Sequence, residues 1–143
     1  MTQEDKDLLL KDLSTRLPYG VKISIPDLWT QEMEIEILDE IFKGDDGLYR
    51  VNSKGQCIEY VKPYLFPMSS MTVEQRWKVQ ALLPDKCEIS FTDSKIKFYD
   101  ADYHAIKLEQ FEKLFKFFNM WHIDYRGLIP MGLANDATNL NIY

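Results

Sequence analysis

Residues 61–72 read VKPYLFPMSSMT, and within this segment the alternation typical of β-strands stops and helical periodicity starts. Its two prolines cannot donate hydrogen bonds to a sheet, so we expect residues 64–66, which lie between them, to form an edge, a crossing or an extended connection. Thr72, with Gln75 three residues further on, fits a capping box that opens a helix. The segment therefore separates a part of the chain rich in predicted strands from a part with a hairpin and two further helices.

The N-terminal part predicts one helix followed by four short strands. The helix spans residues 3–16, with Thr2 as its N-cap and leucines along one face. These leucines are Leu9, Leu10, Leu13 and Leu17. Apolar alternation predicts strands at residues 21–25, 33–42, 48–52 and 57–62. Four such strands predict a curled antiparallel sheet, and an SH3-like partial barrel is one form it could take.

The second predicted strand carries a row of acidic residues. Three apolar residues alternate there with three glutamates: Met33, Ile35 and Ile37 with Glu32, Glu34 and Glu36. We expect the apolar side to face the core and the glutamates, together with Glu40, to form a solvated face that discourages edge pairing. Two alternatives are that this acidic face receives a basic protein surface or mimics the phosphates of DNA.

The C-terminal part predicts a hairpin at residues 87–98 and a helix at residues 103–120 with a broad aromatic face. No linker rich in Gly, Ser or Pro divides the chain, so we expect residues 1–143 to form a single domain. The predicted fold class is α+β, with an N-terminal helix, a curled antiparallel sheet, a β-hairpin and two further helices.

The charge is concentrated near the N-terminus. The chain has 17 basic and 23 acidic residues, a net charge of −6. Residues 1–46 hold five basic and 12 acidic residues, whereas residues 47–143 hold 12 and 11. A polyanion would be repelled by the first third and would find no strong basic stripe elsewhere, which argues against nucleic-acid binding.

The composition, 45% hydrophobic and 28% charged, is that of a water-soluble protein, without the run of about 18 apolar residues that would span a membrane. The first residues are acidic and polar, unlike a secretory signal. Cys57 and Cys87 each lie in a strand-like alternation, which favours small buried residues in a reducing compartment, while a bridge stays open if their strands are neighbours. We therefore expect a cytoplasmic protein without membrane contact.

Two groups of polar residues could carry chemistry. His122 and Asp124 suit a general base oriented by a carboxylate, although the end of a helix and the following turn explain them more simply. Asp100, Asp102 and His104 have a spacing that suits a divalent cation, but acidic residues before a helix are also ordinary caps. A small metal-dependent or hydrolytic enzyme is therefore the alternative hypothesis, and we predict no metal and no cofactor.

The leading hypothesis is a non-enzymatic interaction module. The motifs GxSxG, GxxxxGK[ST], GxGxxG and HExxH are missing, while three Trp, eight Tyr and eight Phe exceed what a small core needs. Exposed aromatic residues mark surfaces that bind another protein or a second copy of the same chain. The candidate binding residues are Tyr64, Phe66, Trp121, Tyr125 and Arg126. The tail that ends in Tyr143 is expected to dock onto the body of the protein.

Three blocks of the sequence carry a resemblance to a bacterial family. They read KDL and RLPYGV within residues 11–21, KPYL and PMSSMT within residues 62–72, and DYRGLI and GLA within residues 124–134. They are similar to small uncharacterised proteins of Bacteroides-type gut bacteria, in part from phage-like or mobile regions, and the resemblance spans nearly the whole chain. It implies a bacterial cytoplasmic origin and brings with it no activity, cofactor or catalytic residue.

Overall fold

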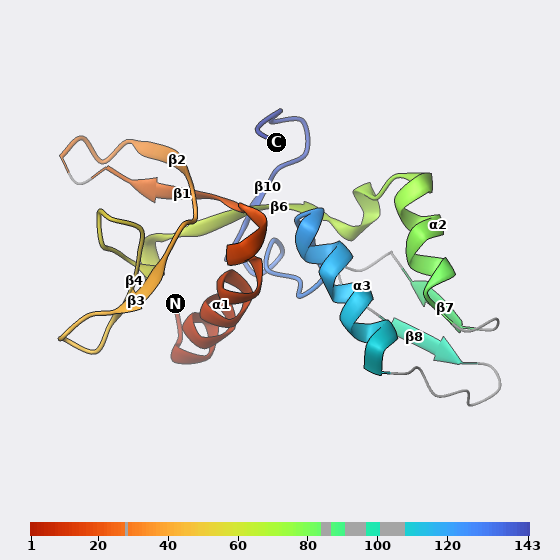
Figure 1. Cartoon of the computed structure of the whole chain (residues 1–143). Coiled ribbons are helices and arrows are strands. Elements are labelled where there is room, and N and C mark those ends of the chain that lie inside the picture. The colour runs from red at the N-terminus through yellow and green to blue at the C-terminus, as the bar shows by residue number, and fades with distance from the viewer. Residues whose placement is uncertain (28, 84–86, 91–96, 101–107) are drawn as a thin grey trace. The chain divides into compact units, whose positions relative to one another are not determined.

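The protein has an α+β fold, in which one helix precedes a run of short strands and two further helices flank a hairpin (Figure 1). The computed structural model describes residues 1–27, 29–83, 87–90, 97–100 and 108–143. Its chain divides into two compact units, of which unit 1 comprises Met1–Leu65 with Leu128–Tyr143 and unit 2 comprises Phe66–Gly127. Among the described residues, no helix has the length and apolar character needed to cross a membrane.

Unit 1 begins with helix α1 (Gln3–Arg16), which has the bounds that the sequence predicts. Thr2 and Asp5 form a capping box, in which Thr2 Oγ1 accepts from the Asp5 backbone N–H at 3.1 Å and Asp5 Oδ2 accepts from the Thr2 backbone N–H at 2.9 Å. One turn of α1 carries a fully buried ion pair, because Arg16 Nε and Nη2 lie 2.7 and 3.1 Å from the two carboxylate oxygens of Asp12.

Two small sheets follow in unit 1. The first has the order β10-β6-β1-β2 and is formed by β1 (Lys22–Pro26), β2 (Met33–Ile37), β6 (Lys62–Pro67) and β10 (Asn135–Asp136). β1 runs antiparallel to β2 and β6, whereas β10 runs parallel to β6. The second is an antiparallel sheet of β3 (Ile41–Lys43), β4 (Tyr49–Val51) and β5 (Gln56–Cys57). The described strands do not close into a barrel.

The strand predicted at residues 33–42 is broken into β2 and β3, which belong to different sheets. Asn52 holds the chain at the break, since its side chain accepts from the Asp39 N–H at 3.0 Å and donates to the Ile37 carbonyl at 2.9 Å. Asn52 has a φ of 51°, in the left-handed region that asparagine tolerates better than most residues. Asn52 lies outside the segment 33–42, so the alternation of apolar and polar residues within that segment does not predict the break.

The segment around residues 57–67 also differs from the prediction. The strand expected at residues 57–62 is a 3-10 turn (Ile58–Tyr60) between the short β5 and β6. Residues 64–66 lie within β6, whose residues pair with β1 at one end and with β10 further along. The proline-flanked segment is therefore a paired strand, with Pro63 placed opposite Ile23 of β1.

The C-terminal tail docks onto unit 1 through its last residue. The Tyr143 hydroxyl accepts from the Lys22 N–H at 2.9 Å and donates to the Tyr64 carbonyl at 2.8 Å, so it bridges β1 and β6. The Lys22 ammonium donates to the Ile142 carbonyl and lies 5.7 Å from the centre of the Tyr143 ring. The core of unit 1 is formed mainly by α1, β1 and the segments around them: Leu9, Leu13, Val21, Ile23, Ile25, Leu38, Val51, Ile58, Val61, Leu65, Leu128, Leu133 and Ala134.

The described residues of unit 2 form two α-helices, a hairpin and a short strand. Helix α2 (Val73–Ala81) begins with the predicted capping box of Thr72 and Gln75, and helix α3 (Leu108–Met120) lies within the predicted range. Residues 103–107 of that prediction, and residues 91–96 of the hairpin predicted at residues 87–98, lie outside the described residues. β7 (Cys87–Ser90) and β8 (Lys97–Asp100) form the predicted antiparallel hairpin, and β9 (Ile123–Asp124) pairs in parallel with Phe66 and Pro67. The core residues of unit 2 are Met68, Met71, Val79, Leu83, Leu114, Phe118, Ile123 and Tyr125.

Candidate functional site

Strand β2 exposes its apolar side and half-buries its acidic side. Met33, Ile35 and Ile37 are 56, 48 and 55% exposed, whereas Glu34 and Glu36 are half-buried. The expectation that the apolar residues face the core is therefore wrong. The expected acidic face is only partly in water, since Glu32 and Glu40 are exposed but Glu34 and Glu36 are half-buried. Because side chains alternate along a strand, placing the glutamates on the inner side forces all three apolar residues outward.

The register with β1 fixes this orientation. Glu36 lies opposite Ile23 and Glu34 lies opposite Ile25. Residues directly opposite each other in an antiparallel pair share a face of the sheet. Since Ile23 and Ile25 are fully buried in the core of unit 1, the two glutamates occupy the margin of the core side.

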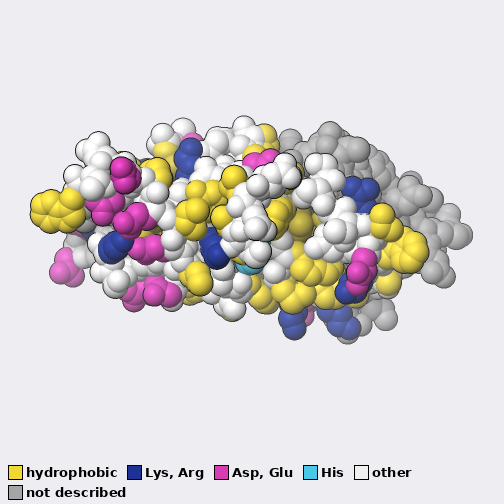
Figure 2. All heavy atoms as spheres, turned by 90° about the horizontal axis from the view of Figure 1, so that it is seen from above, with side chains coloured by type: hydrophobic (Ala, Val, Ile, Leu, Met, Phe, Trp, Pro, Cys, Tyr) yellow, Lys and Arg dark blue, Asp and Glu magenta, His cyan; other side chains and the backbone are white. Residues whose placement is uncertain are grey.

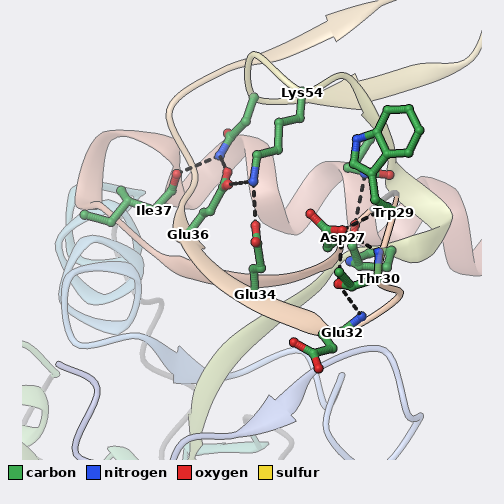
Figure 3. Close-up of polar contacts among 11 residues, drawn as sticks. Asp27, Trp29, Thr30, Glu32, Glu34, Glu36, Ile37 and Lys54 are labelled. Atoms are coloured by element: carbon green, nitrogen blue, oxygen red, sulfur yellow. Dashed lines mark hydrogen bonds and ion pairs between the residues drawn. The ribbon is translucent and has the colours of Figure 1, made fainter.

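Lys54 lies between the two glutamates and offsets one of their two negative charges (Figure 3), and Asn52 bonds to Glu36. The Lys54 ammonium lies 2.5 Å from Glu34 Oε2 and 2.7 Å from Glu36 Oε1, and Asn52 Nδ2 donates to Glu36 Oε2 at 3.1 Å. The hydrogen bond from Lys54 lowers the pKa of Glu36, and the two carboxylates raise the pKa of Lys54. The carboxylates of Glu34 and Glu36 thus find their polar partners in residues 52–54 of the same unit.

The outer edge of β2 is open. β2 is the last strand of its sheet among the described residues, and Figure 1 shows it outermost in its hairpin with β1. The Leu38 N–H donates to the Val21 carbonyl at 2.9 Å, and the Asp27 N–H donates to the Glu32 carbonyl at 2.8 Å. Because hydrogen-bonded pairs alternate in an antiparallel ladder, the even-numbered residues of β2 bond to β1, and the odd-numbered residues direct their N–H and C=O groups outward.

Asn52 closes one end of this edge and leaves the other end open. The Ile37 carbonyl accepts from Asn52 Nδ2, so the outward groups of Met33 and Ile35 form the open part. The residues with outward backbone groups are thus the same ones whose apolar side chains are exposed. On that side, Met33 also borders a shallow hollow of about 530 Å³, lined further by Ser24, Lys62, Tyr64, Asn135 and Leu140.

The loop between β1 and β2 holds an exposed tryptophan in a defined turn. Trp29 is 92% exposed, yet its N–H donates to Asp27 Oδ1 at 2.8 Å. The same oxygen accepts from the N–H and hydroxyl of Thr30 at 2.7 and 3.1 Å (Figure 3). These hydrogen bonds lower the pKa of Asp27 because they stabilise its charged form. An aspartate that bonds the backbone two and three residues later is typical of a turn, and here it restrains the Trp29 amide.

The hairpin region also carries the net negative charge of the protein. Residues 23–42 contain six acidic residues and no Lys, Arg or His, while the remaining 17 acidic and 17 basic residues of the chain balance. Figure 2 shows acidic side chains beside exposed hydrophobic ones at the left of the view, where the hairpin lies in Figure 1. Apolar side chains, open backbone groups and negative charge therefore coincide on one element.

The aromatic residues proposed from the sequence lie elsewhere. Tyr64 is half-buried in β6 within unit 1, next to the hollow described above, whereas Phe66, Trp121, Tyr125 and Arg126 belong to unit 2. The Phe66 N–H donates to the His122 carbonyl at 2.9 Å, and the Trp121 ring stacks on the Phe117 ring at 4.8 Å.

Tyr125 belongs to the core of unit 2. It is buried, and its ring centre lies 5.3 Å from that of Phe115 and 5.6 Å from that of Phe118. The Arg126 guanidinium lies over the Tyr125 ring at 4.5 Å, within the range of a cation–π contact. Aromatic rings thus build much of this core, and the content of aromatic residues alone does not separate them from binding residues.

Of the residues considered for chemistry, two are buried, Asp100 ends β8, and the others lie outside the described part. His122 and Asp124 are both buried, and Asp124 pairs with Pro67 through β9. Of the group considered for a cation, Asp102 and His104 lie outside the described residues. Within the described ranges, no three His, Cys, Asp or Glu side chains are close enough together to hold a metal ion.

A second pocket in unit 1, of about 280 Å³, is lined by α1, β3, β4 and residues 57–59. Its volume falls just below the range of roughly 300–1,000 Å³ that is usual for ligand pockets. Lys6 and Glu59, which line it, form an ion pair with each other at 2.5 Å, and Asp7 and Lys43 are its other charged lining residues. Cys57, also at its margin, carries a free thiol.

No protein-family model matches the chain, and neither the curated proteins nor the solved structures yield a match to it. Functional inference therefore rests on the residues of this chain. The sequence reasoning missed Trp29, for which the signal was its position two residues after Asp27, a residue type that orders short turns.

Proposed function

We propose that this protein is a non-enzymatic protein-interaction module that binds its partner at the β1–β2 hairpin. The observation that carries the proposal is the row of three exposed apolar side chains on a strand with an open outer edge. Single exposed apolar residues are ordinary on protein surfaces, but a contiguous row on one element is typical of interaction sites.

The hairpin combines features that favour tight binding. Tryptophan is enriched among the residues that dominate binding energy, and Trp29 is almost fully accessible. The bonds from Asp27 restrain the Trp29 and Thr30 amides, and those from Lys54 restrain the side chains of Glu34 and Glu36. A preorganised surface loses less conformational entropy on binding.

The competing functions have weaker support. A general acid or base must reach substrate, and burial of His122 and Asp124 within unit 2 disfavours that role. A phosphate mimic needs an uninterrupted row of carboxylates, whereas Lys54 lies between Glu34 and Glu36. The proposal includes a cytoplasmic setting, which the free thiol of Cys57 supports.

Selection from a random peptide display library tests this function. We expect the wild-type protein to enrich peptides whose binding is lost in the double variant Trp29→Ala/Ile35→Thr. Trp77→Ala is the matched control, because Trp77 is 73% exposed but lies on α2 in unit 2. Circular dichroism verifies that both variants are folded. Failure to enrich any peptide, or enriched peptides that bind the double variant as well as the wild type, would contradict the proposal.

A further inference from the structure

We propose that the partner binds as an extended strand added to the outer edge of β2, with basic and apolar residues alternating along it. This inference rests on the proposed function and specifies both the mode of binding and the chemistry of the partner. Addition of a strand to an exposed sheet edge is a common form of peptide recognition, in which backbone hydrogen bonds supply affinity and alternate side chains supply specificity.

The backbone of β2 is prepared for such an addition. Met33 and Ile35 direct N–H and C=O groups outward, and the Asp27–Glu32 and Val21–Leu38 bonds fix that alternation from both ends. Asn52 already occupies the Ile37 carbonyl, so the added strand pairs with the half of β2 nearer to Trp29.

The two faces of β2 select different residues in the partner. Residues of the added strand on the outer face of the sheet lie beside Met33 and Ile35, where apolar side chains remove exposed hydrocarbon from water. Residues on the other face lie beside Glu34 and Glu36, whose two carboxylates share the single ammonium of Lys54. The excess negative charge there favours Lys or Arg in the partner.

Charge also favours a foreign basic strand over a second copy of this chain. An antiparallel pair of β2 strands related by a two-fold axis at Ile35 would place Glu34 of each copy opposite Glu36 of the other. Like charges directly opposite each other destabilise a strand pair. Each copy would also bring six acidic residues and no basic residue in residues 23–42 to the contact.

Three capped seven-residue peptides test the inference with the full-length protein. The first alternates valine and lysine, the second alternates valine and glutamate, and the third has the composition of the first with its valines and lysines in two blocks. We expect the first to bind at least roughly tenfold more tightly than the other two, as expected for two cross-strand charge pairs and a matching apolar face. N-methylation of the peptide residues whose N–H groups bond to β2 should abolish binding. N-methylation of the residues between them should preserve it.

Variants and amide signals provide a second readout. Glu34→Gln/Glu36→Gln should weaken binding of the valine–lysine peptide by roughly tenfold, whereas Glu74→Gln on exposed α2 should leave it unchanged. In NMR spectra, the peptide should protect the Met33 and Ile35 amides from exchange. Strand addition would be overturned if neither set of N-methylated peptides lost binding, or if the Met33 and Ile35 amides stayed unprotected in the complex.

Two further results separate this inference from the proposed function. If library peptides bind the hairpin but lack alternating basic residues, the interaction function stands and the inference fails. If no peptide of any composition binds, both fail. A dimer in sedimentation equilibrium whose Met33 and Ile35 amides are protected without peptide would also overturn the inference, because the edge would then be a contact between copies.

Discussion

Ile25 and Ile35 lie on opposite faces of the same sheet, so replacing each with threonine should cost the protein very different amounts of stability. Ile25 is fully buried in the core of unit 1, whereas Ile35 is 48% exposed on the outer face of β2. Threonine keeps the branched Cβ that suits a strand, so the comparison isolates burial from strand propensity.

The expected losses follow from what each side chain buries. Ile25→Thr removes buried hydrocarbon and places a hydroxyl in the core, which should lower the free energy of unfolding by about 2–4 kcal/mol. Ile35→Thr removes half-exposed hydrocarbon, and its hydroxyl remains in water, so the expected loss is about 0.5 kcal/mol. Urea unfolding followed by far-UV circular dichroism at 25 °C measures both values.

The refuting result is equally specific. If Ile35→Thr lowers the free energy of unfolding as much as Ile25→Thr does, the apolar side of β2 faces the core, as the sequence alternation alone predicts. Met33, Ile35 and Ile37 would then not be exposed, and the proposed interaction surface on β2 would be wrong. Equal m-values among the wild type and the two variants serve as the control for two-state unfolding.

Three further predictions concern charged and titrating groups. Lys54→Met should lower the urea midpoint, because Glu34 and Glu36 lose their shared cation, and the decrease should be smaller in high salt. Lys78→Met on exposed α2 should change the midpoint less, and equal shifts in the two variants would contradict the prediction. Arg16→Met should lower the free energy of unfolding by about 3–5 kcal/mol, because it leaves Asp12 charged and buried. An added Asp12→Leu should recover part of that loss in the same urea assay. A loss below about 1 kcal/mol for Arg16→Met would refute the stabilising role of the Asp12–Arg16 ion pair. Burial raises the pKa of Tyr143 from 10 to about 12, although the residue as a whole is 43% exposed. The contribution of its hydroxyl to the free energy of unfolding is therefore complete below pH 10 and is lost as pH rises toward 12. The difference in unfolding free energy between the wild type and Tyr143→Phe should shrink over this range, and a constant difference would refute the prediction.

The helices are readable from the sequence because their signals are local. Thr2 and Thr72 each cap a helix through a residue three positions later, and both helices begin where those pairs predict. The α+β class and the hairpin of unit 2 follow in the same way from alternation and turn residues.

The orientation of β2 is not readable because distant residues decide it. An alternating strand is compatible with either face inward, and the apolar side would ordinarily be chosen. Here Lys54, 20 residues from Glu34, supplies the charge that lets the glutamates face inward, and Asn52 binds the end of the strand. Neither contact can be predicted from the sequence of residues 33–37 alone.

The aromatic residues predicted from the sequence lie outside the hairpin. Tyr125 packs among rings of its own unit, and Trp121 stacks on Phe117, so these residues help to build a core. Composition counts rings without locating them. Trp29 is distinguished by its surroundings, since the turn that carries it is ordered by Asp27 while its ring remains in solvent.

Amide hydrogen exchange of the free protein, measured residue by residue by NMR, tests the open edge of β2 most directly. The N–H groups of Glu34 and Glu36 bond to β1 and should be protected, while those of Met33 and Ile35 point outward and should exchange rapidly. Protection of Met33 and Ile35, with rapid exchange of Glu34 and Glu36, would contradict the account.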